Sequence, residues 1–377
     1  REMWNVIEVD SSRGCPFSCT FCNVEITHGQ KVRYRTPENI HGEIEQCVKQ
    51  FGTNFVVFND STFTIRKDRV LEIVKGLPGI GIEGYSVNAH VNTVDEEMLR
   101  NQCRRYVREF TDRYPATTVV YACKAYVNPS LARIFMEEGL GLDVVSGGEL
   151  AVAMSADFPA EAIYFHGNNK SQDELRMALD YGVGRIVVDS FHELELLDRI
   201  AADAGKVQGI LLRVSPGIDP HTHTHTTTGI LDSKFGFPIE TGDATLAIRR
   251  ALGASHLSLQ GLHFHLGSPI FELEPYQAAT ELVLRFAAEF REEGLELREF
   301  SPGGGFAIAY TRDQKPPDIG EYAETIVSTM NTTCQALGMA PPQLIIEPGR
   351  SIIGPAGVAL YRVGVIKDIP GVRKYVS

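Results

Sequence analysis

From residue 117 to residue 350 the chain alternates short β-rich runs with longer amphipathic stretches. The runs are rich in apolar and β-branched residues, and there are eight of them: 117–125, 141–146, 163–167, 185–190, 209–216, 259–268, 297–306 and 343–350. Between them lie stretches with apolar residues near every 3.6 positions, such as 173–181, 194–204 and 276–293, which predict helices. Eight strands alternating with helices over about 250 residues is the count of a (β/α)8 barrel. We therefore predict an α/β fold with a closed parallel barrel.

The segment before residue 93 has the same rhythm but stops early. It predicts strands at 6–11, 55–61 and 84–91 and helices at 37–51 and 67–75. Three strands cannot close a barrel and leave two unpaired edges. A further helix at 95–110 could belong to either half, because its apolar residues share one face. We place the junction at 92–94, which divides the chain into domains 1–93, 94–356 and 357–377.

The composition limits the kinds of partner that the chain can have. The chain has 377 residues, a net charge of −12 and no apolar stretch long enough to span a bilayer, which needs about 20 residues. The negative charge argues against a nucleic-acid or anionic-membrane partner. Seven cysteines, three clustered and four scattered, do not form a disulfide framework, so we expect a reducing cytoplasm. The chain begins at Arg1, and we expect it to be a fragment of something longer.

Polar and glycine residues gather at the ends of the eight runs. They are Lys124, Asp143, His166, Arg213, His265, Gly303 to Gly305, Glu347 and Arg350. Active sites of parallel barrels lie at the carboxyl ends of the strands. This rim therefore predicts a site, and its residue types suit an anionic aromatic cofactor.

Three features of the rim carry chemistry, and each has a simpler alternative. Lys124 follows an apolar strand, where desolvation would lower its pKa and make its amine a nucleophile; the alternative is a surface lysine. The glycines at 303–305 would let backbone N–H groups approach a phosphate, with Ser268 and Arg350 as added donors, or would simply form a turn. Glu347 could hydrogen-bond a pyridine nitrogen, or could be a structural carboxylate paired with Arg350.

The motifs identify a family. Tyr121-Ala-Cys-Lys124-Ala, His166-Gly-Asn-Asn-Lys-Ser171, Lys234-Phe-Gly236, His263-Phe-His-Leu-Gly-Ser268, Gly303-Gly-Gly-Phe306 and Glu347-Pro-Gly-Arg350 follow one another in that order. With them, residues 94–377 resemble the diaminopimelate decarboxylase family of alanine racemase-like (fold type III) barrels, which use pyridoxal 5′-phosphate (PLP). The resemblance implies decarboxylation of meso-2,6-diaminopimelate to L-lysine, a step of lysine biosynthesis.

The resemblance also implies roles. Lys124 would attach PLP, with Asp143 and Arg213 nearby, His265 would stack on the ring, and Glu347 would contact the ring nitrogen. The phosphate contacts would be Gly267, Ser268, Gly303, Gly304, Gly305, Gly349 and Arg350. Arg350 would also meet the carboxylate of a small amino-acid substrate.

The chain departs from the family in three places. Pro269 stands where glutamine is usual, and Tyr126 where asparagine is common. The family continues beyond the barrel into a C-terminal β-domain, whereas this chain ends at Ser377. We therefore expect residues 357–377 to start a truncated domain, activity to be impaired, and a homodimer to form if that domain is present.

Cys15, Cys19 and Cys22 form a Cys-x3-Cys-x2-Cys pattern, which suits an iron–sulfur cluster with one open iron. With the segments 35–40 and 58–63, they make residues 1–93 resemble half of a radical SAM barrel of the cobalamin-binding subgroup. The resemblance implies a [4Fe–4S] cluster that binds S-adenosylmethionine.

Three functions remain open at this point: a PLP decarboxylase with a front module, a radical SAM enzyme, or a non-functional fusion or chimeric fragment of the two. A further pattern, His221-Thr-His-Thr-His225, has the spacing of a metal site on a strand. It lies beside Pro220 in an expected loop, so we interpret it as loop sequence.

Overall fold

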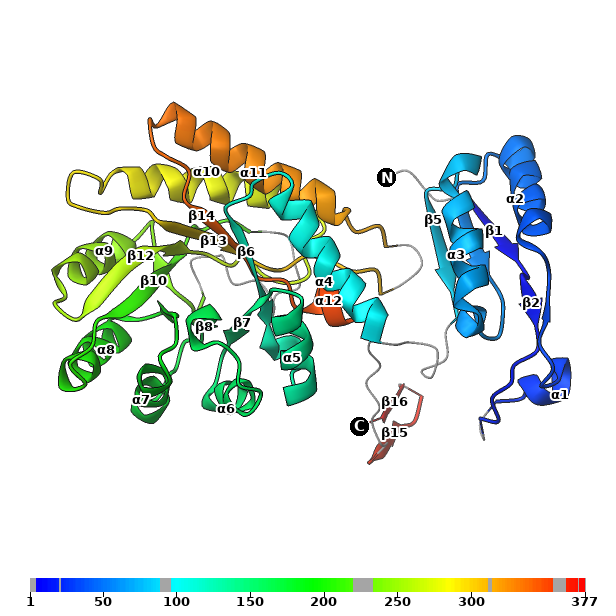
Figure 1. The fold of residues 1–377 in the computed structure, drawn as a ribbon, viewed down its shortest axis with the longest axis horizontal. Helices are drawn as coiled ribbons and strands as arrows, with labels where there is room; N and C mark the ends of the chain where they lie inside the picture. Colours follow the sequence, from blue (N-terminus) through cyan, green and yellow to red (C-terminus); the bar gives the residue numbers. More distant parts are fainter. Residues whose placement is uncertain are drawn as a thin grey trace.

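A computed structural model describes residues 5–19, 22–88, 96–219, 233–310, 314–354, 364–371 and 373–376. Within them lie a barrel, a smaller N-terminal unit and a short C-terminal hairpin (Figure 1).

Eight parallel strands close the barrel, as predicted. In chain order they are β6 (Thr117–Ala122), β7 (Gly141–Val144), β8 (Ile163–Phe165), β9 (Arg185–Val188), β10 (Gln208–Ser215), β12 (Leu257–His263), β13 (Glu299–Gly303) and β14 (Gln343–Ile346). Each pairs with the next, and β14 returns to β6, where Ile346 lies opposite Val119. The two-residue strand β11 (Phe237–Pro238) pairs with the end of β10. Closure leaves none of the eight strands with a free edge.

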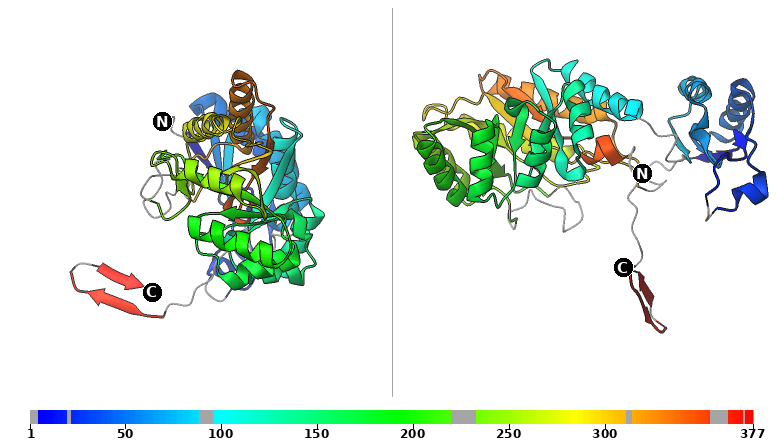
Figure 2. Two further views of the ribbon diagram at one scale, coloured as in Figure 1. Left: turned by 90° about the vertical axis from the view of Figure 1, so that its left-hand side faces the viewer. Right: turned by 60° about the horizontal axis from the view of Figure 1, so that its bottom comes forward.

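Helices surround the strands (Figures 1 and 2). They are α4 (Glu96–Thr111), α5 (Pro129–Glu137), α6 (Gly147–Ser155), α7 (Gln172–Tyr181), α8 (Phe191–Asp203), α9 (Asp243–Gly253), α10 (Glu274–Ala288), α11 (Ile319–Ala336) and α12 (Arg350–Ile353), with the 3₁₀ turns η4 (Cys123–Ala125) and η5 (Ala160–Ala162). Several begin at a side-chain cap; Ser171 and Glu174, for example, form a reciprocal capping box on α7. Helices α5, α6, α7 and α8 each start within seven residues of the end of the preceding strand.

Helix α4, which the sequence left open between the two halves of the chain, packs against the barrel. Its buried residues Leu99, Cys103, Tyr106 and Phe110 belong to the barrel's main core. The Tyr106 hydroxyl donates to Ser351 Oγ at 2.7 Å. Helix α4 is therefore the lead-in helix of the barrel.

The N-terminal unit is a three-stranded parallel sheet in the order β1–β4–β5. Its elements are β1 (Val6–Val9), β2 (Ser12–Arg13), α1 (Val24–His28), β3 (Arg33–Tyr34), α2 (Pro37–Phe51), β4 (Phe55–Phe58), η1 (Phe63–Ile65), α3 (Lys67–Gly76), η2 (Pro78–Ile80) and β5 (Gly84–Val87). Nine buried residues, among them Ile44 and Ile73 from α2 and α3, form a core that shares no member with the barrel's. The predicted three strands and two helices are all present.

Two strands, β15 (Ile366–Ile369) and β16 (Arg373–Val376), pair antiparallel near the C-terminus. The proposed domain boundaries at 93/94 and 356/357 lie outside the described residues and stay predictions. Among the described helices, none has both the length and the apolar content needed to cross a membrane.

Candidate active site

The carboxyl ends of the barrel strands bring the predicted rim residues together. Lys124 lies in η4 directly after β6, Asp143 lies within β7, and His166 follows β8. Arg213 lies in β10 and Glu347 follows β14. Because all the strands are parallel and closed, residues up to 223 positions apart meet at one rim.

Lys124 and Asp143 form the first pair of the site. Lys124 Nζ lies 3.7 Å from Asp143 Oδ2. The Asp143 side chain is fully buried, but that of Lys124 is 52% exposed, so the predicted desolvation of the amine is not found.

Burial makes the Asp143 carboxyl group harder to ionise than an ordinary aspartate. Its pKa is raised to about 7, first by burial, with Lys124 opposing and Glu347 adding to the rise. Neither carboxyl oxygen has a hydrogen-bond partner among the described residues. Buried oxygens without partners are costly, so they point to a polar group that completes the site.

Glu347 is the second carboxyl group, and it is held quite differently. Ser301 Oγ donates to its Oε1 at 2.7 Å, and His263 Nε2 lies 3.2 Å from its Oε2. Burial opposes ionisation, but the contacts from His263, His166 and Ser301 outweigh it and hold the pKa of Glu347 well below its usual range. The alternative of a structural pair with Arg350 is wrong, because Arg350 Nη1 donates to Tyr310 Oη at 2.7 Å instead.

The glycines and His265 form a close-packed cradle. The Gly304 amide donates to His265 Nδ1 at 3.3 Å. A Cβ at Gly304 would lie 2.0 Å from the Glu347 carbonyl oxygen, and one at Gly305 would lie 2.3 Å from that of Gly267. Only glycine fits these positions, because the backbone of residues 303–305 packs directly against neighbouring backbone. Gly349 is equally confined against Ala122, at the end of β6.

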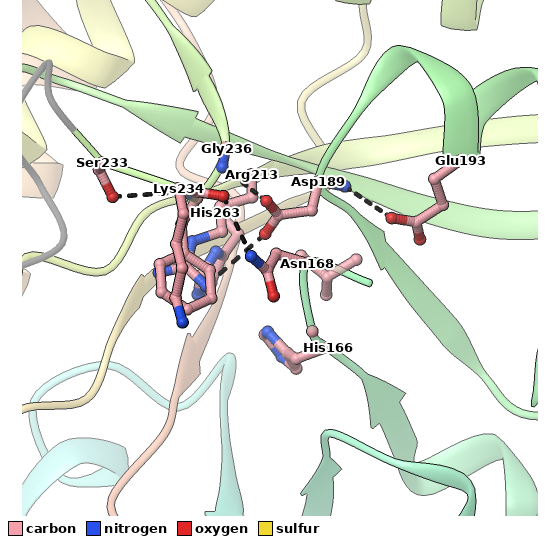
Figure 3. Close-up of polar contacts among 12 residues, drawn as sticks. His166, Asn168, Asp189, Glu193, Arg213, Ser233, Lys234, Gly236 and His263 are labelled. Carbon is pink, nitrogen blue, oxygen red and sulfur yellow. Dashed lines mark hydrogen bonds and ion pairs between the residues drawn. The ribbon is translucent and has the colours of Figure 1, made fainter. Parts of the chain in front are cut away.

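Arg213 is clamped from two sides (Figure 3). Its Nη1 lies 3.7 Å from Asp189 Oδ2, and its guanidinium lies 4.3 Å from the centre of the Phe235 ring. The Gly236 amide donates to Asp189 Oδ1 at 2.7 Å. The Lys234-Phe-Gly236 motif therefore serves to hold this buried arginine at the rim.

The residues of the His166-to-Ser171 motif make contacts in different places. His166 enters the site, and Asn168 Nδ2 donates to the Lys234 carbonyl at 3.2 Å. Lys170 forms a buried ion pair of 2.6 Å with Glu193. Glu193 in turn accepts from the Asp189 amide at 3.1 Å, so the motif braces the clamp on Arg213 (Figure 3).

Sequence reasoning missed four contributors to this site. Ser301 and His263 were not assigned as partners of Glu347, and Asp189 and Phe235 were not assigned to Arg213. A signal existed for three of them, since Ser301, His263 and Asp189 are polar residues in or directly after an apolar strand. Their partners could not be read from the chain, because each pair spans many residues.

Two of the N-terminal thiols differ in exposure. Cys15 is buried with Sγ 3.5 Å from Thr62 Oγ1, whereas Cys22 is exposed. Cluster binding stays a prediction. The histidines at 221–225 lie outside the described residues.

The rim residues fit PLP on the evidence of their own geometry. Orphaned polar atoms on Asp143 and His166 lie beside an accessible lysine amine, and a glycine cradle lies across the rim. Residues 99–354 match the family model "Pyridoxal-dependent decarboxylase, pyridoxal binding domain". The chain therefore belongs to the pyridoxal-dependent decarboxylase family.

Three of the chain's relatives are described as diaminopimelate decarboxylases. The chain is 42% identical over 284 residues to diaminopimelate decarboxylase of Bacillus subtilis, an alignment that covers 75% of this chain and 65% of that protein. It is 43% identical over 321 residues to the enzyme of Corynebacterium efficiens, covering 83% and 68%. The crystal structure of diaminopimelate decarboxylase from m. jannaschi matches with a TM-score of 0.66 and 35% identity, over 75% of this chain and 65% of that one. The chain thus spans about two thirds of the length of these relatives.

Proposed function

We propose that the protein is a PLP-dependent decarboxylase that converts meso-2,6-diaminopimelate to L-lysine. The observation that carries the proposal is the presence of two unlike buried carboxyl groups at the strand ends, one of them beside a lysine. Asp143, without donors, lies beside the Lys124 amine, and Glu347 is anchored by Ser301 and His263. An ionised carboxylate that cannot rotate is what a protonated pyridine nitrogen needs as a partner.

The proposed roles follow from position. Lys124 would attach the cofactor through its amine, and Glu347 would hold a proton at the ring nitrogen. His265 would pack against the ring, and the residues that would hold the phosphate are Gly267, Ser268, Gly303, Gly304, Gly305, Gly349 and Arg350. When bound, PLP supplies the electron sink that allows a carboxylate to leave an amino acid's α-carbon. Arg213, clamped by Asp189, adds a fixed positive charge to the rim.

The substrate proposal depends on the relatives. A crystal structure of the m. jannaschii diaminopimelate decarboxylase is described as a co-complex with L-lysine, and the chain matches it with 34% identity and a TM-score of 0.66. We propose the same product here, with Arg350 contacting a substrate carboxylate. The homodimer and the cytoplasmic location predicted from the sequence remain proposals of the same kind.

Attachment of PLP to Lys124 is the direct test. The full chain mixed with PLP and then borohydride should carry a pyridoxyl group on Lys124, found by peptide mass spectrometry. Lys124→Ala should lose the label, and the matched control Lys206→Ala should keep it, because Lys206 binds the Leu179 carbonyl beside α7. A reducible adduct that persists in Lys124→Ala would show that the assignment is wrong.

A further inference from the structure

His166 is a buried residue of a sequence motif to which the proposed chemistry assigns no role. It follows β8 directly, and its amide donates to the Val144 carbonyl at 2.8 Å, so the strand pairing fixes its position. Its side chain is 5% exposed. The ring meets that of His263 edge-on, with centres 4.9 Å apart.

The atom that matters is Nε2, because it faces both carboxyl groups of the site. It lies 3.5 Å from Glu347 Oε1 and 3.8 Å from Asp143 Oδ1. It has no hydrogen-bond partner at its present position. A small rotation of the ring would bring it within hydrogen-bond distance of either carboxyl group, but it carries only one hydrogen to give.

The surroundings keep this imidazole neutral. Burial lowers the pKa of His166 well below its usual value, although Glu347 opposes the change. The titratable and charged groups that face it come from five elements of the barrel: Lys124 after β6, Asp143 in β7, Arg213 in β10, His263 at the end of β12 and Glu347 after β14. Between two carboxyl groups, a neutral ring acts as a hydrogen-bond donor to one of them at a time.

We propose that His166 is a positioning residue that decides which of the two buried carboxyl groups is ionised. By giving its single Nε2 hydrogen to Glu347, it favours the charge there and leaves Asp143 without a donor and neutral. The arrangement suits the proposed function, on which this purpose rests, because Glu347 must be ionised beside the ring nitrogen. A neutral Asp143 also leaves the Lys124 amine free of a fixed counter-charge.

We expect the ionisation of Asp143 to depend on the charge of Glu347 through His166. When Glu347 loses its charge, His166 is released to donate to Asp143, whose ionised form is then stabilised. Asp143 should therefore ionise at a lower pH in Glu347→Gln, for two reasons. The neighbouring negative charge is absent, and His166 becomes available as a hydrogen-bond donor to Asp143. Without His166 only the first reason remains.

A double-mutant cycle on the full chain, prepared free of PLP, measures this directly. Infrared difference spectra against Asp143→Asn follow the C=O band of the protonated Asp143 side chain and give its pH midpoint. We expect Glu347→Gln to lower that midpoint by about one pH unit or more in the wild-type background. In the His166→Phe background the shift should be less than half as large.

Two further variants separate position from packing. His166→Gln keeps a side-chain N–H and should restore most of the coupling, whereas His166→Leu replaces the phenylalanine variant if the larger ring does not fit. The matched control is His256→Phe, since His256 Nδ1 lies 3.8 Å from Asp198 at the opposite end of β12. It should leave the full shift in place.

Equal shifts with and without His166 would mean that the carboxyl groups interact through space, and would overturn the proposal. So would a failure of His166→Gln to restore the coupling lost in His166→Phe. Because the measurement needs no PLP, these outcomes are independent of the labelling of Lys124. Loss of labelling would contradict the proposed function and leave the coupling to be judged on its own data.

Discussion

The barrel and the N-terminal unit are built from the same strand-then-helix repeat, yet they differ in what that repeat achieves. In the barrel, β14 pairs with β6, so every strand has two neighbours. In the N-terminal unit, β1 and β5 each pair only with β4. Strand number alone separates a closed ring with a rim from an open sheet with two edges.

The closed ring also explains why the chemistry is concentrated there. Eight strand ends converge on one rim, which supplies a lysine, two buried carboxyl groups and a glycine cradle within a few ångströms. The N-terminal sheet has three such ends, and its three cysteines follow β1 and the short strand β2 in the chain. The following predictions test this contrast, beginning with the largest effect.

Glu347→Gln should reduce turnover of meso-diaminopimelate by at least about 100-fold, because it removes a preorganised charge that acts only on the cofactor. Borohydride labelling of Lys124 should be unchanged, which shows that the variant still binds PLP. The matched control in the N-terminal unit is Glu45→Gln, whose side chain pairs with Lys49 on the surface and should leave turnover intact. Wild-type turnover in Glu347→Gln would disprove the role of this residue.

Ile44→Ala should destabilise the N-terminal unit by about 3 kcal/mol, because it leaves a cavity in a core of only nine residues. Since the two cores share no residue, the barrel's unfolding transition should keep its midpoint. Leu211→Ala, which empties a position inside the barrel, should do the reverse. Calorimetry of the full chain resolves the two transitions. A common shift of both in either variant would show that the units unfold together.

Asp143→Asn should remove a pH dependence that is specific to the barrel. The pKa of Asp143 is raised to about 7 in the folded protein, compared with about 3.9 in the unfolded chain. The stabilisation that this group contributes is therefore fully present below about pH 3.9, and it is lost as the pH rises through about 7. The loss should be on the order of 3 kcal/mol between those limits. Urea titrations of the barrel transition at several pH values measure it. A wild-type profile as flat as that of Asp143→Asn would contradict the raised pKa.

Lys49→Ala should have the smallest effect, a loss of about 0.4 kcal/mol from the N-terminal transition. The Glu45–Lys49 pair is a single i,i+4 contact of 2.9 Å on an exposed helix face. Chemical denaturation at low and high salt gives the value, and salt should abolish it. A loss above about 1 kcal/mol that survives high salt would indicate that the lysine stem packs on the sheet.

Much of the architecture could be predicted from local patterns. All eight barrel strands, the three N-terminal strands and helix α2 at Pro37–Phe51 lie where the alternation of apolar residues places them. The identity of Lys124, Asp143 and Glu347 as rim residues also followed, because each stands at or near the end of a predicted strand. Such signals are local, because periodicity and strand ends can be recognised within about ten consecutive residues.

What only the tertiary structure decided is which of these residues meet. Ser301 and His263 anchor Glu347 across 46 and 84 residues, and Arg350 turns to Tyr310 rather than to Glu347. Helix α4 joins the barrel because its apolar face finds the barrel core, although its sequence suited either half. These outcomes depend on strand register and on closure of the ring. Both arise from the packing of the whole barrel, so no short stretch of sequence contains them.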